Sequence, residues 1–433
     1  MAFQGPKGTR DFYPEDMQVI SFIFNTWKRT AWLFGFEEYE GPMFEHLDLF
    51  TKKSGEEIVK QLYNFKDKGD RDIALRPEIT PTLARMIVAR GSSLKKPVKW
   101  FSIPRLFRYE RMQKGRLREF HQLNLDIIGE AGISADAELI AAVVFMMKSF
   151  CLASTDFKIR VNSRKLMSEC LSALGFPAEK IPAAYSILDK KGKIEPEALQ
   201  EMYAKDGIAG SDVQIIENLL ACASLDHVRA LVAAKADQVP ALAEIDEFFS
   251  KISAYGLSEF VLFDIAVIRG LAYYTGIVFE VFDEQKSLRA IAGGGRYDAL
   301  IEQFGGEPTP AVGFGMGDVV LYELLKEKNL IPQYRKPVDV YIINFNKDDS
   351  LPAISFASLL REKGVSCEFS LKGQNFKKQM EHAQHARMVA FVGGDEWKEG
   401  KVKIKDMGSG EEKVVEKDEA YSILAMGTHP PAP

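Results

Sequence analysis

The sequence predicts an α+β protein of two domains, the first of which carries a helical insertion. Helical and β-prone runs follow one another without a regular order over residues 1–330. Within that range, residues 159–258 change to an Ala-, Leu- and Lys-rich pattern with helical spacing and few strand signals. Residues 337–427 instead alternate strand-like runs with helices, which is typical of a small α/β domain with a largely parallel sheet. A chain of 433 residues is too long for one ordinary core, which supports two or more domains.

Composition and cysteine usage indicate a soluble protein of a reducing compartment. Hydrophobic residues make up 46% of the chain and charged residues 27%, which fits no fibrous, disordered or disulfide-rich class. The most apolar stretch, 139–147, predicts a buried helix, because it is far shorter than the roughly 18 residues of a membrane span. The N-terminus lacks a secretory signal pattern, and the four cysteines include no C-x-x-C pair. We therefore expect a cytoplasmic protein without a membrane partner, a disulfide framework or a zinc site.

The first part of the chain shows two transitions between helix and strand. Residues Asp16–Gly35 carry apolar side chains at helical spacing and end at a glycine, before the extended run 36–44. Residues Asp72–Leu75 predict a strand, which leads through the turn Arg76–Thr80 into a helix that ends near Gly91. Both helices are therefore expected to lie next to strands of the first domain.

A long hairpin follows. Residues 98–109 and 120–128 are apolar and β-prone, and they flank a basic loop. After the helical insertion, strand-like runs return over 260–268 and twice more within 276–295. The glycine-rich segment 311–318 then precedes a helix, so the first domain resumes after the insertion.

The hairpin carries a concentration of cations, namely Arg105, Arg108, Arg111, Lys114, Arg116 and Arg118. Because side chains alternate in a strand, Leu106, Arg108 and Glu110 are expected to share one face. An arginine on a buried sheet is costly unless it meets an anion, and a planar guanidinium suits phosphate. Residues 105–126 therefore predict a phosphate-binding centre, with a solvated basic hairpin as the alternative. The net charge of −5 gives no general attraction to nucleic acid, so any RNA contact depends on local basic patches.

Glycines and tyrosines form a second group of candidates. The segments Gly293–Asp298 and Gly313–Gly317 allow a close approach of the backbone to a ligand, although each also fits a tight turn. The spacing G-x-G-x-G in the second segment is not that of a dinucleotide-binding fingerprint. Tyr273 and Tyr274 are either core residues with satisfied hydroxyl groups or residues that contact a ligand.

Several of these segments resemble one protein family. Residues 107–122, FRYERMQKGRLREFHQ, resemble the second signature motif of class II aminoacyl-tRNA synthetases. Residues 269–280, RGLAYYTGIVFE, and 292–300, AGGGRYDAL, resemble the two histidine-specific segments of histidyl-tRNA synthetases. Further similar segments occur near both ends of the chain, so the resemblance covers essentially its whole length.

The resemblance implies a class II synthetase fold, in which an antiparallel sheet flanked by helices forms a catalytic domain over 1–330. Residues 337–427 would form an anticodon-binding domain. The implied reaction joins histidine to the α-phosphate of ATP and passes the histidyl group to the 3′ end of tRNA(His). ATP would be used with Mg²⁺, and the protein would be a homodimer whose interface includes the motif around Pro42. Lys372, Lys377 and Lys378 are either contacts for tRNA phosphates or solvated surface charges.

The resemblance also implies roles for individual residues. Arg108 and Arg269 would act at the reacting α-phosphate from opposite sides. The neighbours of His121 favour a residue that lines the site, with a general base as the alternative. The residues expected to bind histidine are Glu78, Ile79, Thr80, Arg108, Gln122, Asp126, Arg269, Tyr273 and Tyr274. The residues expected to bind ATP are Arg108, Glu110, Arg116 and Phe120. No residue is expected to bind a metal ion directly.

Two positions depart from the family. Val320 stands where the third class II motif normally has an arginine for the ATP γ-phosphate, and Ala272 stands where many relatives have Asp. These departures leave a second reading open, the non-catalytic histidine-binding regulatory subunit of ATP phosphoribosyltransferase. That relative typically lacks the C-terminal domain seen here from about Val338. The synthetase is therefore the favoured reading.

Overall fold

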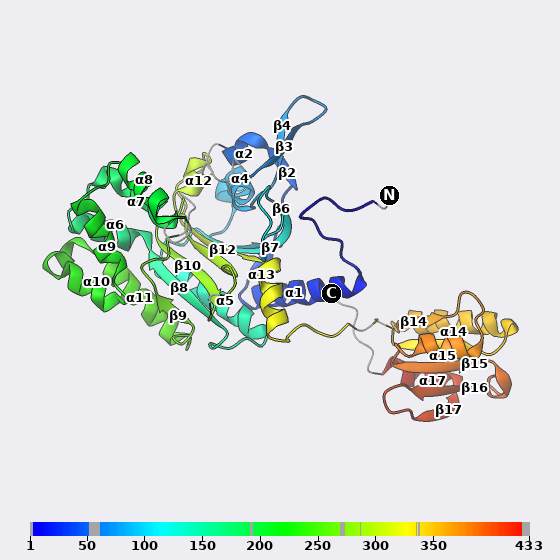
Figure 1. The fold of residues 1–433 in the computed structure, drawn as a ribbon. Coiled ribbons are helices and arrows are strands. Elements are labelled where there is room, and N and C mark those ends of the chain that lie inside the picture. The colour runs from blue at the N-terminus through cyan, green and yellow to red at the C-terminus, as the bar shows by residue number, and fades with distance from the viewer. Residues whose placement is uncertain are drawn as a thin grey trace. The chain divides into compact units, whose positions relative to one another are not determined.

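A computed structural model describes residues 3–51, 61–190, 194–268, 273–285, 287–334, 336 and 338–426. The chain divides into two compact units, Met1–Pro332 and Gln333–Pro433, each of which is drawn in Figure 1. None of the described helices combines the length and the apolar character that a membrane crossing requires.

A mixed sheet of nine strands is the centre of the first unit. Eight strands lie side by side in the order β1 (Glu37–Glu38), β5 (Val98–Ser102), β7 (Glu119–Ile128), β12 (Ala311–Gly317), β11 (Ala292–Arg296), β10 (Ile277–Asp283), β8 (Phe157–Ser163) and β9 (Val261–Phe263). The ninth strand, β6 (Arg105–Phe107), pairs with the start of β7. Among the strand pairings of this sheet that the described residues form, those of β1 with β5 and of β8 with β9 are parallel and the others are antiparallel. The predicted antiparallel sheet is therefore confirmed for the interior, and the predicted hairpin corresponds to β5, β6 and β7.

Helices cover one face of this sheet. They are α1 (Pro14–Leu33), α5 (Ile133–Ser149) and α13 (Asp318–Glu327). Ile20, Ile23 and Trp27 of α1 are buried at helical spacing, and Ile23 and Trp27 join one core with α5 and the sheet. The apolar stretch 139–147 lies in α5 and is buried except for Phe145, as the sequence predicts.

The other face of the sheet carries the small elements α2 (Leu47–Thr51), α4 (Thr80–Arg90), the 3₁₀ turn Gly91–Ser93 and α12 (Leu300–Gln303), and a three-stranded sheet of β2 (Phe44–His46), β4 (Asp72–Leu75) and β3 (Tyr63–Lys66). The chain passes from β4 through Arg76–Ile79 into α4, as the sequence predicts. Arg76 is 3% exposed and holds this turn by donating to the backbone oxygens of Arg105 and Gly41 at 3.0 and 2.9 Å. The turn is thereby fixed above β6 and β7.

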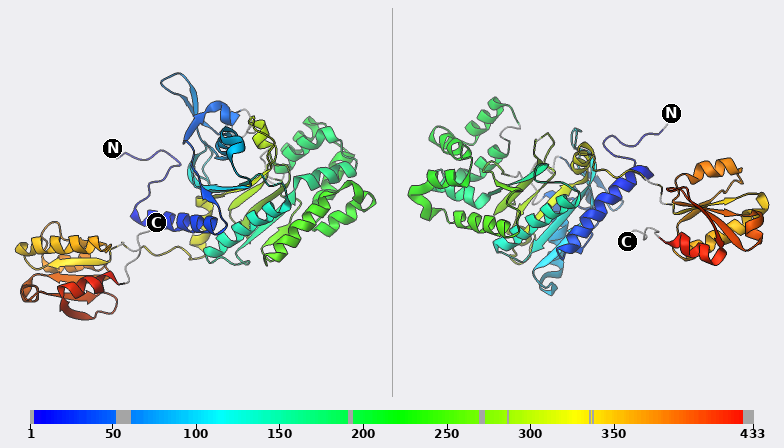
Figure 2. Two further views of the ribbon diagram at one scale, coloured as in Figure 1. Left: turned by 180° about the vertical axis from the view of Figure 1, so that it is seen from behind. Right: turned by 90° about the horizontal axis from the view of Figure 1, so that it is seen from below.

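The helical insertion lies beside the β8–β9 end of the sheet (Figure 2). It contains α6 (Arg164–Ala173), α7 (Ile181–Lys190), α8 (Pro196–Lys205), α9 (Ser211–Leu220), α10 (Leu225–Val232) and α11 (Ala241–Ala254), with 3₁₀ turns at Ala178–Lys180 and Ala233–Gln238. The insertion begins later than the expected residue 159, because β8 belongs to the main sheet as far as Ser163. Phe157, Ile159 and Val161 are fully buried at a spacing of two, which is a strand pattern.

The second unit is a five-stranded sheet with helices. The strand order is β14 (Cys367–Phe369), β13 (Val340–Asn344), β15 (Met388–Val392), β16 (Lys401–Asp406) and β17 (Glu412–Glu416). Its helices are α14 (Ser350–Glu362), α15 (Phe376–Ala383), α16 (Gly394–Lys398) and α17 (Lys417–Ala425), with a 3₁₀ turn at Lys347–Asp349. The expectation of a largely parallel sheet holds only for β14, β13 and β15. The strands β16 and β17 form an antiparallel hairpin, in which Val402 and Ile404 are buried between exposed or half-buried lysines.

Candidate active site

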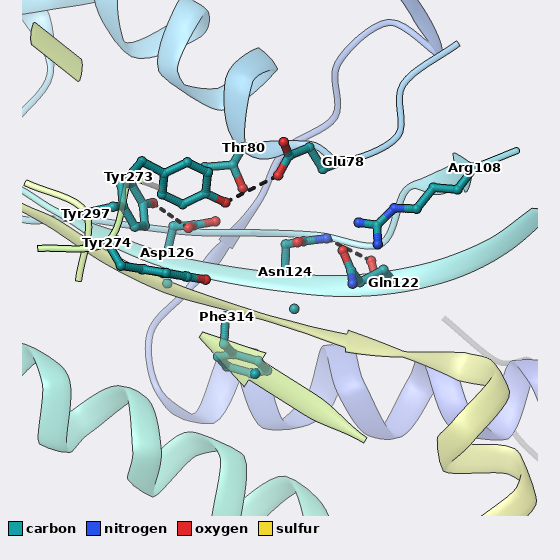
Figure 3. Close-up of a pocket in the computed structure, with 13 residues that line it drawn as sticks. Glu78, Thr80, Arg108, Gln122, Asn124, Asp126, Tyr273, Tyr274, Tyr297 and Phe314 are labelled. Atoms are coloured by element: carbon teal, nitrogen blue, oxygen red, sulfur yellow. Dashed lines mark hydrogen bonds between the residues drawn. The ribbon is translucent and has the colours of Figure 1, made fainter. Parts of the chain in front are cut away.

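A small polar cavity lies on the face of the main sheet that α1 and α5 do not cover. Gln122, Asn124 and Asp126 project into it from β7, because alternate residues of a strand share one face (Figure 3). Glu78 reaches it from the turn before α4 and Thr80 from the first residue of α4, and Tyr273, Tyr274 and Tyr297 close it from the other side. The cavity has a volume of about 450 Å³, which includes space open to solvent, and it is lined mainly by polar atoms.

Glycines of β12 provide the room for these side chains. Gly313 lies opposite Asp126 in the sheet, and a Cβ atom at Gly313 would be 1.9 Å from Oδ1 of Asp126. A Cβ atom at Gly315 would be 2.7 Å from the side-chain amide carbon of Gln122. The glycine-rich segment therefore forms no tight turn; it is a strand whose lack of side chains lets the polar residues of β7 stand upright.

Asp126 is the most deeply buried acid of this cavity. It is 3% exposed, and the hydroxyl of Tyr297 donates a hydrogen bond of 2.5 Å to its Oδ1 atom. Its Oδ2 atom is buried and has no hydrogen-bond partner among the described residues. Burial raises the pKa of Asp126 to about 7, while the hydrogen bond from Tyr297 acts in the opposite direction. An N–H donor of a ligand would satisfy the remaining oxygen.

Glu78 lies on the opposite wall of the cavity. The side chain of Glu78 is 5% exposed and accepts a hydrogen bond of 3.3 Å from the hydroxyl of Tyr273. The neighbouring residue Ile79 is fully buried in an apolar cluster with Leu83 and Tyr274 and does not line the cavity. The side chain of Ile79 therefore supports the wall, and the role expected for this residue in histidine binding stays a prediction.

A second and larger space of about 1270 Å³ adjoins the first. Arg108, Gln122, Gly293 and Gly315 line both spaces. Arg108 donates from Nε to the backbone oxygen of Pro77 at 2.9 Å, and its guanidinium carbon is 5.4 Å from the centre of the Phe120 ring. The guanidinium is thereby held at the junction of the two spaces, and Figure 3 shows it beside Gln122.

Glu110 and Arg116 line the larger space and form an ion pair with each other. The sequence predicts that Arg108 and Glu110 lie on a strand with Leu106, but β6 ends at Phe107. The chain bends there, since the backbone N–H of Glu110 donates to the oxygen of Arg108 at 2.8 Å. Arg108 and Glu110 still reach one cavity, but this bend, rather than strand alternation, brings them together.

The other candidate residues of the hairpin point elsewhere. His121 lies on the helix-covered face, where its ring is 4.9 Å from that of Phe24 and its Nε2 atom accepts a hydrogen bond from Arg105 at 3.2 Å. It lines neither space, so the expectation that His121 is a lining residue is wrong. Arg118 covers the ring of Tyr109 at 4.1 Å. Among the cations predicted here for phosphate, only Arg108 and Arg116 line the described cavities.

Arg269 and Ala272 lie outside the described residues, so the role expected for Arg269 stays a prediction. The structure adds Asn124 and Tyr297 to the site. Asn124 stands between Gln122 and Asp126 at a spacing of two, which is a signal that the sequence contains. No pattern in the sequence indicates that Tyr297 would meet Asp126, because 171 residues separate them.

Comparison with known proteins gives a consistent result. The model of the family described as histidyl-tRNA synthetase matches residues 8–317, and that of an anticodon-binding domain matches residues 339–426. A histidine–tRNA ligase of Arabidopsis thaliana chloroplasts and mitochondria is 42% identical over 94% of this chain and 84% of its own length. A histidine–tRNA ligase of Opitutus terrae is 39% identical over 98% of both chains. The crystal structure of histidyl-tRNA synthetase from Nostoc sp. PCC 7120 shares the fold, with a TM-score of 0.80 and 24% identity over 98% of this chain and 99% of that one. The chain belongs to the histidyl-tRNA synthetase family.

Proposed function

We propose that this protein activates L-histidine with ATP and transfers the histidyl group to the 3′ end of tRNA(His). A carboxylate oxygen of histidine attacks the α-phosphorus of ATP, and the bond to the bridging oxygen breaks, so that diphosphate leaves. A ribose hydroxyl of the tRNA then attacks the acyl carbon of histidyl-adenylate, and AMP leaves. One observation carries the proposal: a small polar cavity and a larger cationic one meet at Arg108, where an amino acid and a nucleotide would react.

The small cavity suits histidine. The buried Oδ2 atom of Asp126 would accept from an imidazole N–H, and Tyr274 would contact the same ring. Glu78 and Thr80, with Tyr273, would bind the ammonium group. Buried polar groups that are left unpaired by an apolar analogue would reject it strongly.

The larger cavity suits ATP. Phe120 offers a ring for adenine, and Glu110 with Arg116 would bind the nucleotide. Arg108 would stabilise the charge that develops on the α-phosphate, with Gln122 orienting the histidine carboxylate and Arg269 acting from the other side. Mg²⁺ would enter with its phosphate ligands as MgATP, because the described residues contain no group of three acids, histidines or cysteines that could hold the ion alone.

The second unit offers a surface for the anticodon. The rings of Phe345 and Phe376 are 42% and 44% exposed and are stacked, with centres 5.8 Å apart. Exposed aromatic rings bind unpaired bases by stacking. Lys377 and Lys378 follow Phe376 on α15 and are exposed, so they would meet phosphates; Lys372 would do the same from the preceding loop. The loop 111–118 would face the acceptor end of the tRNA.

We also propose a cytoplasmic homodimer. All four cysteines are free, and three of them are buried, which fits a reducing compartment. The strand β1 is the end strand of the main sheet and pairs on one side only among the described strands, so a second copy of the chain would cover it together with the motif around Pro42.

The test is histidine-dependent exchange of pyrophosphate into ATP, followed by charging of a histidine tRNA transcript by the purified protein. Loss of both activities with histidine binding intact would instead indicate the regulatory subunit of ATP phosphoribosyltransferase. That alternative has less support, because residues 339–426 match an anticodon-binding domain.

A further inference from the structure

The larger cavity contains a cation that neither the sequence patterns nor the comparisons assign. Arg289 precedes β11 and lines this cavity together with Arg108, Arg116 and Val320. The strands β10, β11, β12 and β7 are antiparallel neighbours. The last residues of β10 and β12 and the first residues of β11 and β7 therefore lie at the same end of the strands. Arg289, which precedes β11, therefore lies at the same end of the sheet as the basic loop 111–118, which precedes β7.

The helix α13 supplies no cation to this cavity. Its first residues are Asp318, Val319 and Val320, and Val320 is 7% exposed. Asp318 is fully buried and accepts hydrogen bonds from Arg10 at 2.6 Å and from the backbone N–H of His121 at 3.0 Å. Any cation for the far end of a triphosphate must therefore come from another wall.

Three arginines and the two acids Glu110 and Glu280 line the larger cavity, and the surroundings of the arginines identify that cation. Arg108 is at the junction with the small cavity, where the α-phosphate would react. Arg116 is paired with Glu110. Arg289 is exposed and donates from Nη1 to the amide oxygen of Gln113 at 3.3 Å, and no carboxylate of the described chain lies within 4.0 Å of its guanidinium. A phosphate oxygen would replace this long hydrogen bond to a neutral amide oxygen by a bond between opposite charges.

We propose that Arg289 binds the β- and γ-phosphates of ATP and so takes the place of the arginine that is missing at position 320. This inference rests on the proposed function for the identity of the nucleotide. A phosphate bound by Arg289 would displace the side chain of Gln113, which belongs to the loop 111–118 and accepts the hydrogen bond of Arg289 in the free protein.

The experiment compares binding of α,β-methylene-ATP and of AMP to the full-length protein by titration calorimetry. Arg289→Ala is expected to weaken α,β-methylene-ATP at least tenfold and to leave AMP within twofold, because AMP has no β- or γ-phosphate. Arg289→Lys keeps the charge without the planar fork and should recover part of the loss. Arg229→Ala, a half-exposed arginine of the helical insertion, is the matched control and should change neither ligand.

Two outcomes would overturn the proposal: unchanged affinity of Arg289→Ala for α,β-methylene-ATP, or an equal loss for both nucleotides. Neither outcome depends on catalysis. If Arg289→Ala selectively weakens the triphosphate but the unmodified protein exchanges no pyrophosphate, the role of Arg289 stands and the proposed activity fails.

Discussion

Tyr297 and Asp126 form a buried hydrogen bond of 2.5 Å between β7 and the segment that follows β11. The bond occupies one oxygen of the carboxylate and leaves the other buried without a described partner. The folded protein thus holds an acid whose ionised form is poorly solvated until a ligand arrives. The unpaired oxygen of Asp126 lowers the stability of the free protein and allows a strong hydrogen bond to a bound ligand.

Stability of the free protein should depend on the ionisation of Asp126. Its pKa is about 7 in the folded protein and 3.8 ordinarily, so the folded state keeps a proton between about pH 4 and pH 7 that the unfolded chain has lost. The free energy of unfolding therefore falls as pH rises through this window, by at most roughly 4 kcal/mol. Asp126→Asn removes this titration. In thermal denaturation, the melting temperature of the variant should therefore rise relative to that of the unmodified protein between pH 5 and pH 8. A constant difference across this range would contradict the assignment.

The same variant should bind histidine about ten- to one-hundredfold more weakly at pH 8, because a charge-assisted hydrogen bond to the imidazole is lost. Asp136 also has a raised pKa, about 6, because of its burial. In the stability experiment, the difference between variant and unmodified protein at each pH cancels the contribution of Asp136 to the pH dependence of unfolding.

Removal of the Tyr297 hydroxyl should be costly. In Tyr297→Phe the Oδ1 atom of Asp126 loses its donor, so the variant should lose about 1 to 3 kcal/mol of stability. The pKa of Asp126 should rise further, since that hydrogen bond lowers it. Tyr39→Phe is the matched control: its buried hydroxyl has no hydrogen-bond partner in the described part of the chain, so chemical denaturation should show little loss. Equal losses in both variants would show that the hydroxyl of Tyr297 has no special role.

A methyl group on β12 should damage the histidine cavity. Gly313→Ala places Cβ 1.9 Å from the Asp126 carboxylate and 3.0 Å from the backbone oxygen of Leu125. The carboxylate therefore has to move. We expect histidine binding to fall at least tenfold, with a stability loss of about 1 to 3 kcal/mol from overpacking. Gly317→Ala, on the same strand, meets nothing within 4 Å and should fold normally. Normal histidine affinity in Gly313→Ala would mean that Asp126 does not contact the ligand.

Introduction of arginine at position 320 should not improve the enzyme. Val320 is buried under the loop 111–118, and a Cβ atom on Gly115 would lie only 3.2 Å from its Cγ2 atom. The loop is held in this position by an ion pair of 2.9 Å between Lys114 and Glu327. Val320→Arg should therefore displace the loop and lower pyrophosphate exchange. If only this variant exchanged pyrophosphate, the natural chain would have to be regarded as inactive.

Local patterns predicted the elements that a strand or helix determines by itself. The spacing of Ile20, Ile23 and Trp27 predicted α1, and the two β-prone runs around the basic loop predicted the hairpin of β5, β6 and β7. Predictions that extended a regular pattern past its end were less successful. Arg108 and Glu110 lie beyond β6, and the hairpin of β16 and β17 interrupts the parallel pattern of the second unit.

The sequence by itself determined the family and the order of the main elements. These properties depend on residue types and on spacings within one segment. Only the tertiary structure decided that Tyr297 satisfies Asp126, that Gly313 gives this acid its space, and that Arg289 shares a cavity with Val320. Each of these relationships joins segments that are far apart in the chain. Strand register and the packing of loops against the sheet bring them together, and no local spacing encodes either.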